Sequence, residues 1–202
     1  MLHLIIDTSS KKLTVALCEE TKICAKFTDE FNIGTAERLI PIIDSLFIEA
    51  QKERNDLNTV IVTLGPGSFT GVRIGLSTAK GIGDALDITV LGISALESVA
   101  MDMPRPCIVA LDTKRNDFYT QQFFDNASTD PNTSSLEEII NMGIPVVTDT
   151  PEAFKDTAVK LLPYPENFAL NLLKTALQQA RVSTSDTDPI YIRNAEVTIK
   201  QK

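Results

Sequence analysis

Short apolar runs and amphipathic stretches alternate through the first hundred residues. Three runs rich in β-branched residues come first, joined by polar turns, and this pattern is typical of a three-stranded antiparallel meander. Apolar residues then recur at i, i+3, i+4 and i+7, the spacing of an amphipathic helix. The predicted elements are strands over residues 3–8, 13–19 and 22–30, a helix over 36–54, a strand over 59–64, a helix over 70–86, a strand over 88–93 and a helix from Ser94. The predicted order is βββαβαβα.

A boundary is predicted at residues 103–106, where two prolines in four residues prevent a helix from running through. The pattern then starts again with two strands. The elements expected beyond the boundary are strands over 107–112 and 117–125, a polar stretch over 126–135, a short helix, an apolar run over 144–150, a helix over 165–181 and a closing segment over 188–202. We therefore predict an N-lobe over 1–102 and a smaller C-lobe of related topology over 103–202.

Residues 64–84, LGPGSFTGVRIGLSTAKGIGD, hold six of the nine glycines in the chain. A glycine-rich turn between a strand and a helix often binds phosphate. However, a P-loop has Lys after its last glycine, and here Val72 follows Gly71. The dinucleotide fingerprint GxGxxG is missing as well, because the spacing is GxGxxxG. The phosphate templates therefore do not fit this turn.

A nucleophile elbow around Ser68 is also disfavoured. The GxSxG pattern needs glycine where Pro66 and Thr70 stand. The single histidine, His3, lies inside the first predicted strand and cannot serve as a mobile base for Ser68. One histidine also argues against a histidine-rich metal site. We therefore expect no hydrolytic triad and no metal centre.

Small residues recur every four positions along the second predicted helix and so line one side of it. The stripe consists of Gly71, Gly75, Ala79 and Gly83, with Val72 and Leu76 beside it. Each helical glycine costs about 1 kcal/mol relative to alanine, so a close packing partner is expected. Two partners remain open: the sheet or first helix of this chain, or a second protein.

Composition narrows the function further. The 202 residues carry a net charge of -8, with a pI of about 4.7, which is the wrong sign for a protein that grips nucleic acid by itself. Cys18, Cys24 and Cys107 show no CxxC spacing, so neither a disulfide framework nor a thiolate zinc site is favoured. No apolar run approaches the ~20 residues of a membrane span, and a signal peptide is not recognisable. We expect a cytoplasmic protein.

Three segments, the opening LIIDTSS, the central PGSFTGVRIGLSTAKG and the closing PIYIRNAE, resemble the TsaB (YeaZ) family. The resemblance covers nearly the whole chain and is strongest in residues 1–100. It implies an α/β, two-lobed actin-like fold, shared with sugar kinases and heat-shock chaperone ATPases (the ASKHA fold), with a reduced second lobe. It also implies a role in making threonylcarbamoyladenosine in tRNA.

In that superfamily the first hairpin is a phosphate loop of the form DxGT. Here Asp7, Thr8 and Ser9 are followed by Ser10, and the glycine is absent. The glycine-rich adenosine site of active relatives is missing too, because only Gly143 follows Gly92. The resemblance thus implies a vestigial nucleotide cleft at Asp7, Thr8, Ser9 and Asp112, without a cofactor of its own.

The family resemblance also implies partners. A TsaD-like catalytic subunit would modify the adenosine beside the anticodon in tRNAs reading ANN codons, and a TsaE-like ATPase would join the complex. This chain would bind TsaD, or a second copy of itself in a homodimer, through its first two helices. The expected contacts are the glycine stripe of the second helix and Leu39, Ile43 and Leu46 of the first. The chain would meet tRNA indirectly, and any ATP or ADP would come with its partners.

Two points qualify this prediction. Family members commonly carry His-Ser just ahead of the first helix, whereas this chain has Thr35 and Ala36, so no role of that histidine is carried over. The alternative to a non-catalytic scaffold is a nucleotide-dependent transferase or a glycoprotease-like enzyme of the same superfamily.

Overall fold

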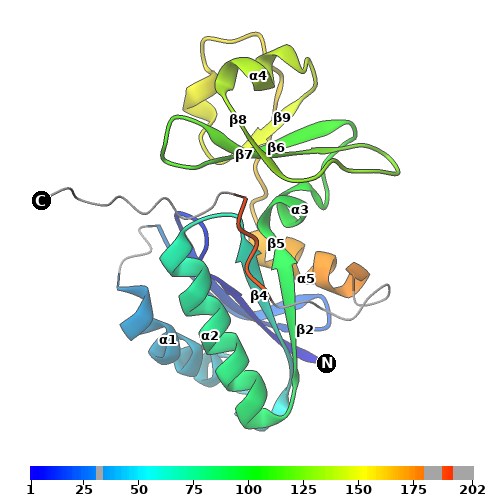
Figure 1. The fold of residues 1–202 in the computed structure, drawn as a ribbon. Coiled ribbons are helices and arrows are strands. Elements are labelled where there is room, and N and C mark those ends of the chain that lie inside the picture. Colours follow the sequence, from blue (N-terminus) through cyan, green and yellow to red (C-terminus); the bar gives the residue numbers. More distant parts are fainter. Residues whose placement is uncertain (31–33, 180–187, 193–202) are drawn as a thin grey trace, which may run out of the picture.

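The computed structural model describes residues 1–30, 34–179 and 188–192 and contains two sheets (Figure 1). The first sheet has the order β3-β2-β1-β4-β5. Its strands are β1 (Leu2–Asp7), β2 (Leu13–Glu19), β3 (Lys22–Asp29), β4 (Leu57–Gly65) and β5 (Thr89–Ser94). The strands β1, β2 and β3 form the predicted antiparallel meander, and β4 and β5 continue the sheet parallel to β1.

Helices cover both faces of this sheet because its central strands are apolar on both sides. Figure 1 shows α1 (Thr35–Glu49) and α2 (Phe69–Leu86) next to each other on one face, where Leu4 and Ile6 of β1 pack. On the other face, Ile5 packs against α5 (Phe168–Gln179). The period of two along β1 thus divides its side chains between two helical layers.

The second sheet has the order β10-β9-β6-β7-β8. Its strands are β6 (Cys107–Asp112), β7 (Phe118–Phe123), β8 (Asn132–Ser134), β9 (Val146–Thr148) and β10 (Leu161–Leu162). One face packs against α3 (Ala95–Ala100) through Val109 and Val147. The other face packs against α4 (Leu136–Asn141) and the 3-10 helix η2 (Pro151–Phe154). A further 3-10 turn, η1 (Arg54–Asp56), precedes β4.

The order βββαβαβα of the first half is confirmed, with differences at the ends of elements. The first helix stops at Glu49 rather than residue 54, because the chain turns at Gln51, whose φ is 53°. The strand β8 lies within the stretch expected to be polar loop, where it completes the sheet edge next to β7. Residues 193–202 of the closing segment lie outside the described residues.

The helix α5 follows the predicted boundary in sequence, yet it packs on the first sheet through Ala169, Leu172 and Leu173. It also contacts α3. The sequence division at residue 102 remains a prediction, because α5 belongs to one half by sequence and to the other by packing. No helix in the described ranges has the length and apolar character to cross a bilayer.

Candidate functional site

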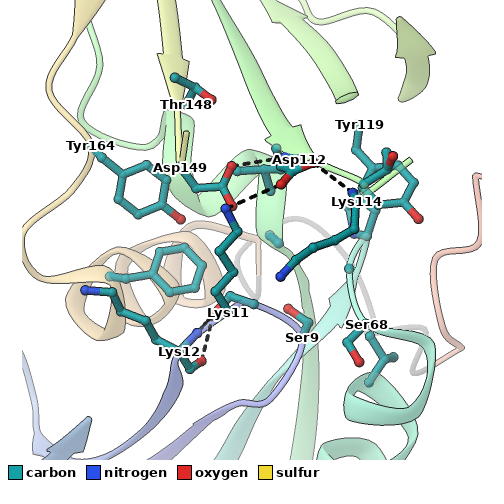
Figure 2. Close-up of a pocket in the computed structure, with 18 of the residues that line it drawn as sticks. Ser9, Lys11, Lys12, Ser68, Asp112, Lys114, Tyr119, Thr148, Asp149 and Tyr164 are labelled. Carbon is teal, nitrogen blue, oxygen red and sulfur yellow. Dashed lines mark hydrogen bonds and ion pairs between the residues drawn. The ribbon is translucent and has the colours of Figure 1, made fainter. Parts of the chain in front are cut away.

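A cavity of about 1280 Å³ opens where loops of the two sheets meet. Its walls come from the loop between β1 and β2, the turn between β4 and α2, and the loop between β6 and β7. The segments around Tyr164 and Tyr191 complete the lining. Figure 2 shows its labelled polar side chains, which reach it from both sheets. This cavity lies at the carboxyl ends of β1 and β4, where open α/β sheets commonly bind ligands.

Asp7 lies behind the cavity wall and is fully buried. One of its carboxylate oxygens accepts hydrogen bonds from the Ser9 amide (2.9 Å), the Ser9 hydroxyl (2.7 Å) and the Thr63 hydroxyl (2.6 Å). The other accepts from the Ser10 hydroxyl at 2.8 Å. Asp7 therefore holds the hairpin loop in shape, and its oxygens are already occupied by groups of this chain.

Ser9 and Asp112, two of the four residues expected at a vestigial cleft, line the cavity. Thr8 is fully buried and donates its hydroxyl to the Gly71 carbonyl oxygen at 2.6 Å. The structure thus brings Ser9 and Asp112 to one cavity, whereas Asp7 and Thr8 support the loop from behind.

An ionic network that was not predicted from the sequence joins the two sides of the cavity. The ammonium of Lys11 lies 3.4 Å from Asp112 Oδ2 and 3.8 Å from Asp149 Oδ2 (Figure 2). Asp149 also accepts a hydrogen bond from the Asp112 amide at 3.0 Å. Burial raises the pKa of Asp149, and it also raises the pKa of the nearby Tyr164. The position of Asp149 directly after a short apolar strand is a signal that could have flagged it.

The glycine turn packs directly on the hairpin loop. The Ser68 amide donates to the Ser9 carbonyl oxygen at 2.8 Å, and a Cβ at Gly67 would lie 2.9 Å from the Ser9 carbonyl carbon. The Ser68 hydroxyl caps α2 by accepting from the Gly71 amide at 3.2 Å. The small residues of this turn thus serve a close approach of two backbone segments, and Ser68 acts as a helix cap.

The glycine stripe of α2 faces the sheet of the same chain. A Cβ at Gly71 would lie 3.0 Å from the carbonyl carbon of Thr8, and one at Gly83 would lie 2.5 Å from Val90 Cγ2. A Cβ at Gly75 would clash with Thr8 Oγ1, and would lie at ordinary contact distance from Ile6 and Val62. Ala79, Val72 and Leu76 are buried in the same layer.

Packing within the chain is enough to explain the small size of these residues, so the contact of the stripe with a second protein stays a prediction. The same holds for the predicted contacts of α1. Leu39, Ile43 and Leu46 are 1%, 4% and 2% exposed and belong to the core beneath the helix. On the solvent-facing side of α1, Ile40 and Ile48 are 49% and 79% exposed.

Three side chains form a cluster at the edge of the cavity. The guanidinium carbon of Arg73 lies 3.5 Å from the ring centroid of Phe69 and 5.6 Å from that of Tyr191. The two rings lie 5.4 Å apart. Tyr191 is brought there because the Ile190 amide donates to the Leu64 carbonyl oxygen at 2.8 Å. This cluster joins the segment around Tyr191 to the start of α2, and sequence spacing gave no sign of it.

Two five-stranded sheets with a cavity lined by loops of both are the arrangement expected of the actin-like fold. The chain resembles an actin-like (ASKHA) protein, the activator of the 2-hydroxyisocaproyl-CoA dehydratase from Clostridium difficile with bound ADPNP, with a TM-score of 0.53 at 10% identity. The match covers 92% of this chain and 100% of that one. The predicted ASKHA fold is thereby confirmed.

The family model described as TsaD, tRNA N6-adenosine threonylcarbamoyltransferase, matches residues 34–192. The chain belongs to this family, and within it to the TsaB (YeaZ) group. It is 37% identical over 100 residues to the tRNA threonylcarbamoyladenosine biosynthesis protein TsaB of Bacillus subtilis, covering 50% of this chain and 44% of that protein.

A Pseudomonas aeruginosa protein described as similar to peptidase YEAZ shares the fold, with a TM-score of 0.74 at 23% identity. That match covers 95% of this chain and 99% of the other. The curated relatives match over a shorter stretch, since the alignments span about half of their length.

Proposed function

We propose that this chain is a non-catalytic subunit that binds a TsaD-like catalytic subunit and supports threonylcarbamoyladenosine synthesis at the adenosine beside the anticodon, in tRNAs reading ANN codons. Membership of the TsaB (YeaZ) group supports this proposal. A TsaE-like ATPase and tRNA belong to the same proposed complex. In the absence of the catalytic subunit, the chain would form a homodimer through the same helices.

The non-catalytic role is supported mainly by the hydrogen bonding of the Asp7 carboxylate. Its carboxylate accepts four hydrogen bonds from Ser9, Ser10 and Thr63, so it is not available to a substrate or to a metal-bound phosphate. The turn at Gly67 and Ser68 packs on the same hairpin loop and leaves little room for a phosphate there. Both features favour a subunit that acts by binding.

The solvent-facing sides of α1 and α2 are the surface we assign to the catalytic subunit. Ile40 and Ile48 are exposed apolar residues of α1, and large exposed apolar side chains are common at protein interfaces. The helices rest on the first sheet through well-buried residues, which leaves their opposite sides facing solvent.

A pull-down with the TsaD-like subunit tests this surface. Ile40→Glu and Ile48→Glu place charges on exposed positions and are expected to weaken binding at least tenfold while the chain stays folded. Phe124→Glu is the matched control, because Phe124 is 41% exposed and follows β7, in the other sheet. Full binding by both isoleucine variants would remove α1 from the interface.

Mass spectrometry of tRNA nucleosides after depletion of this chain tests the cellular role. We expect threonylcarbamoyladenosine to fall, and unchanged levels would refute the proposal. Calorimetry of the isolated chain with ATP tests the enzyme alternative. Heat of binding at millimolar ATP would favour a nucleotide-dependent transferase, whereas its absence supports a subunit whose nucleotides come with its partners.

A further inference from the structure

The charge lining the cavity is opposite in sign to the charge of the chain. The whole sequence has 19 Lys and Arg against 27 Asp and Glu. Within the described part of the chain, five cationic side chains line the cavity, against the two carboxylates Asp112 and Asp149. The five are Lys11, Lys12, Arg73, Lys114 and Arg115. A concave, locally positive surface on an acidic protein concentrates anions at that place.

These cations differ in the ion pairs that they make with the described residues. Lys11 pairs with the two carboxylates, and Lys12 pairs with Glu30 at 2.8 Å. By contrast, no carboxylate of the described residues lies within ion-pair distance of Arg73 or Lys114. Figure 2 shows the Lys114 ammonium directed into the cavity, on the side where Ser9 and Ser68 lie. These groups are suited to bind a phosphate.

The aromatic cluster provides a second kind of contact on the same cavity. Phe69 and Tyr191 are 45% and 46% exposed, although large apolar rings normally gain by burial. Arg73 lies over Phe69 and holds a planar cation beside both rings. Exposed rings with an adjacent guanidinium are the features on which unpaired nucleobases stack.

We propose that this cavity edge binds an unpaired nucleotide of single-stranded RNA, with the base stacked on Phe69 and Tyr191 and a phosphate held by Lys114 and Arg73. The inference rests on the proposed function, since it gives an RNA contact to a subunit of a tRNA-modifying complex. Single-stranded RNA is favoured over a peptide as the ligand, because the cavity combines cations that can bind phosphate with rings on which a base can stack. The hairpin loop that would hold a free nucleotide's phosphates is occupied by the turn at Gly67.

Fluorescence anisotropy of the full chain with a labelled single-stranded oligoadenylate at low salt tests this site. Phe69→Leu keeps an apolar side chain but removes the ring, and it is expected to weaken binding about 5- to 100-fold. Lys114→Gln is expected to reduce the slope of log affinity against log salt by about 0.7. Lys80→Gln removes an exposed cation of α2, the helix that carries Phe69 and Arg73. Lys80 does not line the cavity, so this variant is expected to change neither quantity.

Three results would overturn the inference: no binding by the unmodified chain, an equal loss of affinity in Lys80→Gln, or displacement of the probe by AMP as effective as by unlabelled oligoadenylate. Duplex RNA that binds as tightly as the single strand would also count against stacking. Because the assay uses this chain alone, its outcome is independent of the pull-down. Cavity variants that still bind the catalytic subunit but no longer bind RNA would separate the protein-binding role from the RNA-binding role.

Discussion

Replacing Gly71 with alanine is expected to destabilise the chain, whereas the same replacement at Gly81 is expected to stabilise it. Both glycines lie in α2, so the two variants differ mainly in what the new methyl group meets. At Gly81 it meets nothing within 4 Å, while at Gly71 it lies 3.0 Å from the Thr8 carbonyl carbon and closer still to the oxygen. The pair therefore tests whether the stripe rests on the sheet in solution.

The magnitudes follow from this geometry. Alanine at position 81 gains about 1 kcal/mol of helix propensity and should raise Tm by about 2–4 °C. At position 71 the same gain is offset by overpacking against backbone, about 1–3 kcal/mol, and by strain on the hydrogen bond from Thr8, which contributes about 1 kcal/mol. We expect a net loss of about 2 kcal/mol for Gly71→Ala.

Urea unfolding followed by circular dichroism measures both variants. The midpoints should move in opposite directions at an unchanged m-value, because the surface exposed on unfolding hardly differs. A Gly71→Ala variant as stable as Gly81→Ala would show that α2 does not lie against Thr8, and the stripe would again be available to a partner.

Three further predictions concern titratable groups. Burial, aided by the N-terminal charge, lowers the pKa of His3 below 6.5, so stability should fall as pH drops through 6.5, and His3→Leu should flatten that profile. Burial raises the pKa of Asp149 above 3.8, so stability should fall as pH rises through that region, a trend that Asp149→Asn should remove in urea titrations. Burial raises the pKa of Cys18 to about 12 and also raises that of Cys107, so iodoacetamide at neutral pH should label the half-buried Cys24 first, as peptide mass spectrometry can show.

Each of these has a clear contrary result. An acid-side profile that is the same with leucine at position 3 would mean that His3 is hydrated in solution. A pH trend that survives Asp149→Asn would assign it to another carboxyl group. Rapid labelling of Cys18 or Cys107 in the native chain would show that the sheets open on the timescale of the reaction.

Much of the fold could be predicted from the sequence because its signals are local. The short apolar run of β1 and the four-residue spacing along α2 are both set by neighbouring residues. Ser9 and Asp112 were suggested as cleft residues by the family resemblance and not by periodicity, and both line the cavity. The motif GPGSFTGVRIG was the main basis for assigning the chain to the TsaB (YeaZ) family, and the curated relatives confirmed that assignment.

The sequence could not determine which segment packs against each face of a helix or strand. Spacing shows that the α2 stripe needs a close neighbour, but the position of Thr8 in space decided that the neighbour is its own sheet. Asp7 is occupied by a hydroxyl from Thr63, fifty-six residues away. The cluster of Phe69, Arg73 and Tyr191 likewise forms only because the closing segment returns to β4. Periodicity fixes which side of an element is small, apolar or charged, whereas long-range packing decides what that side touches.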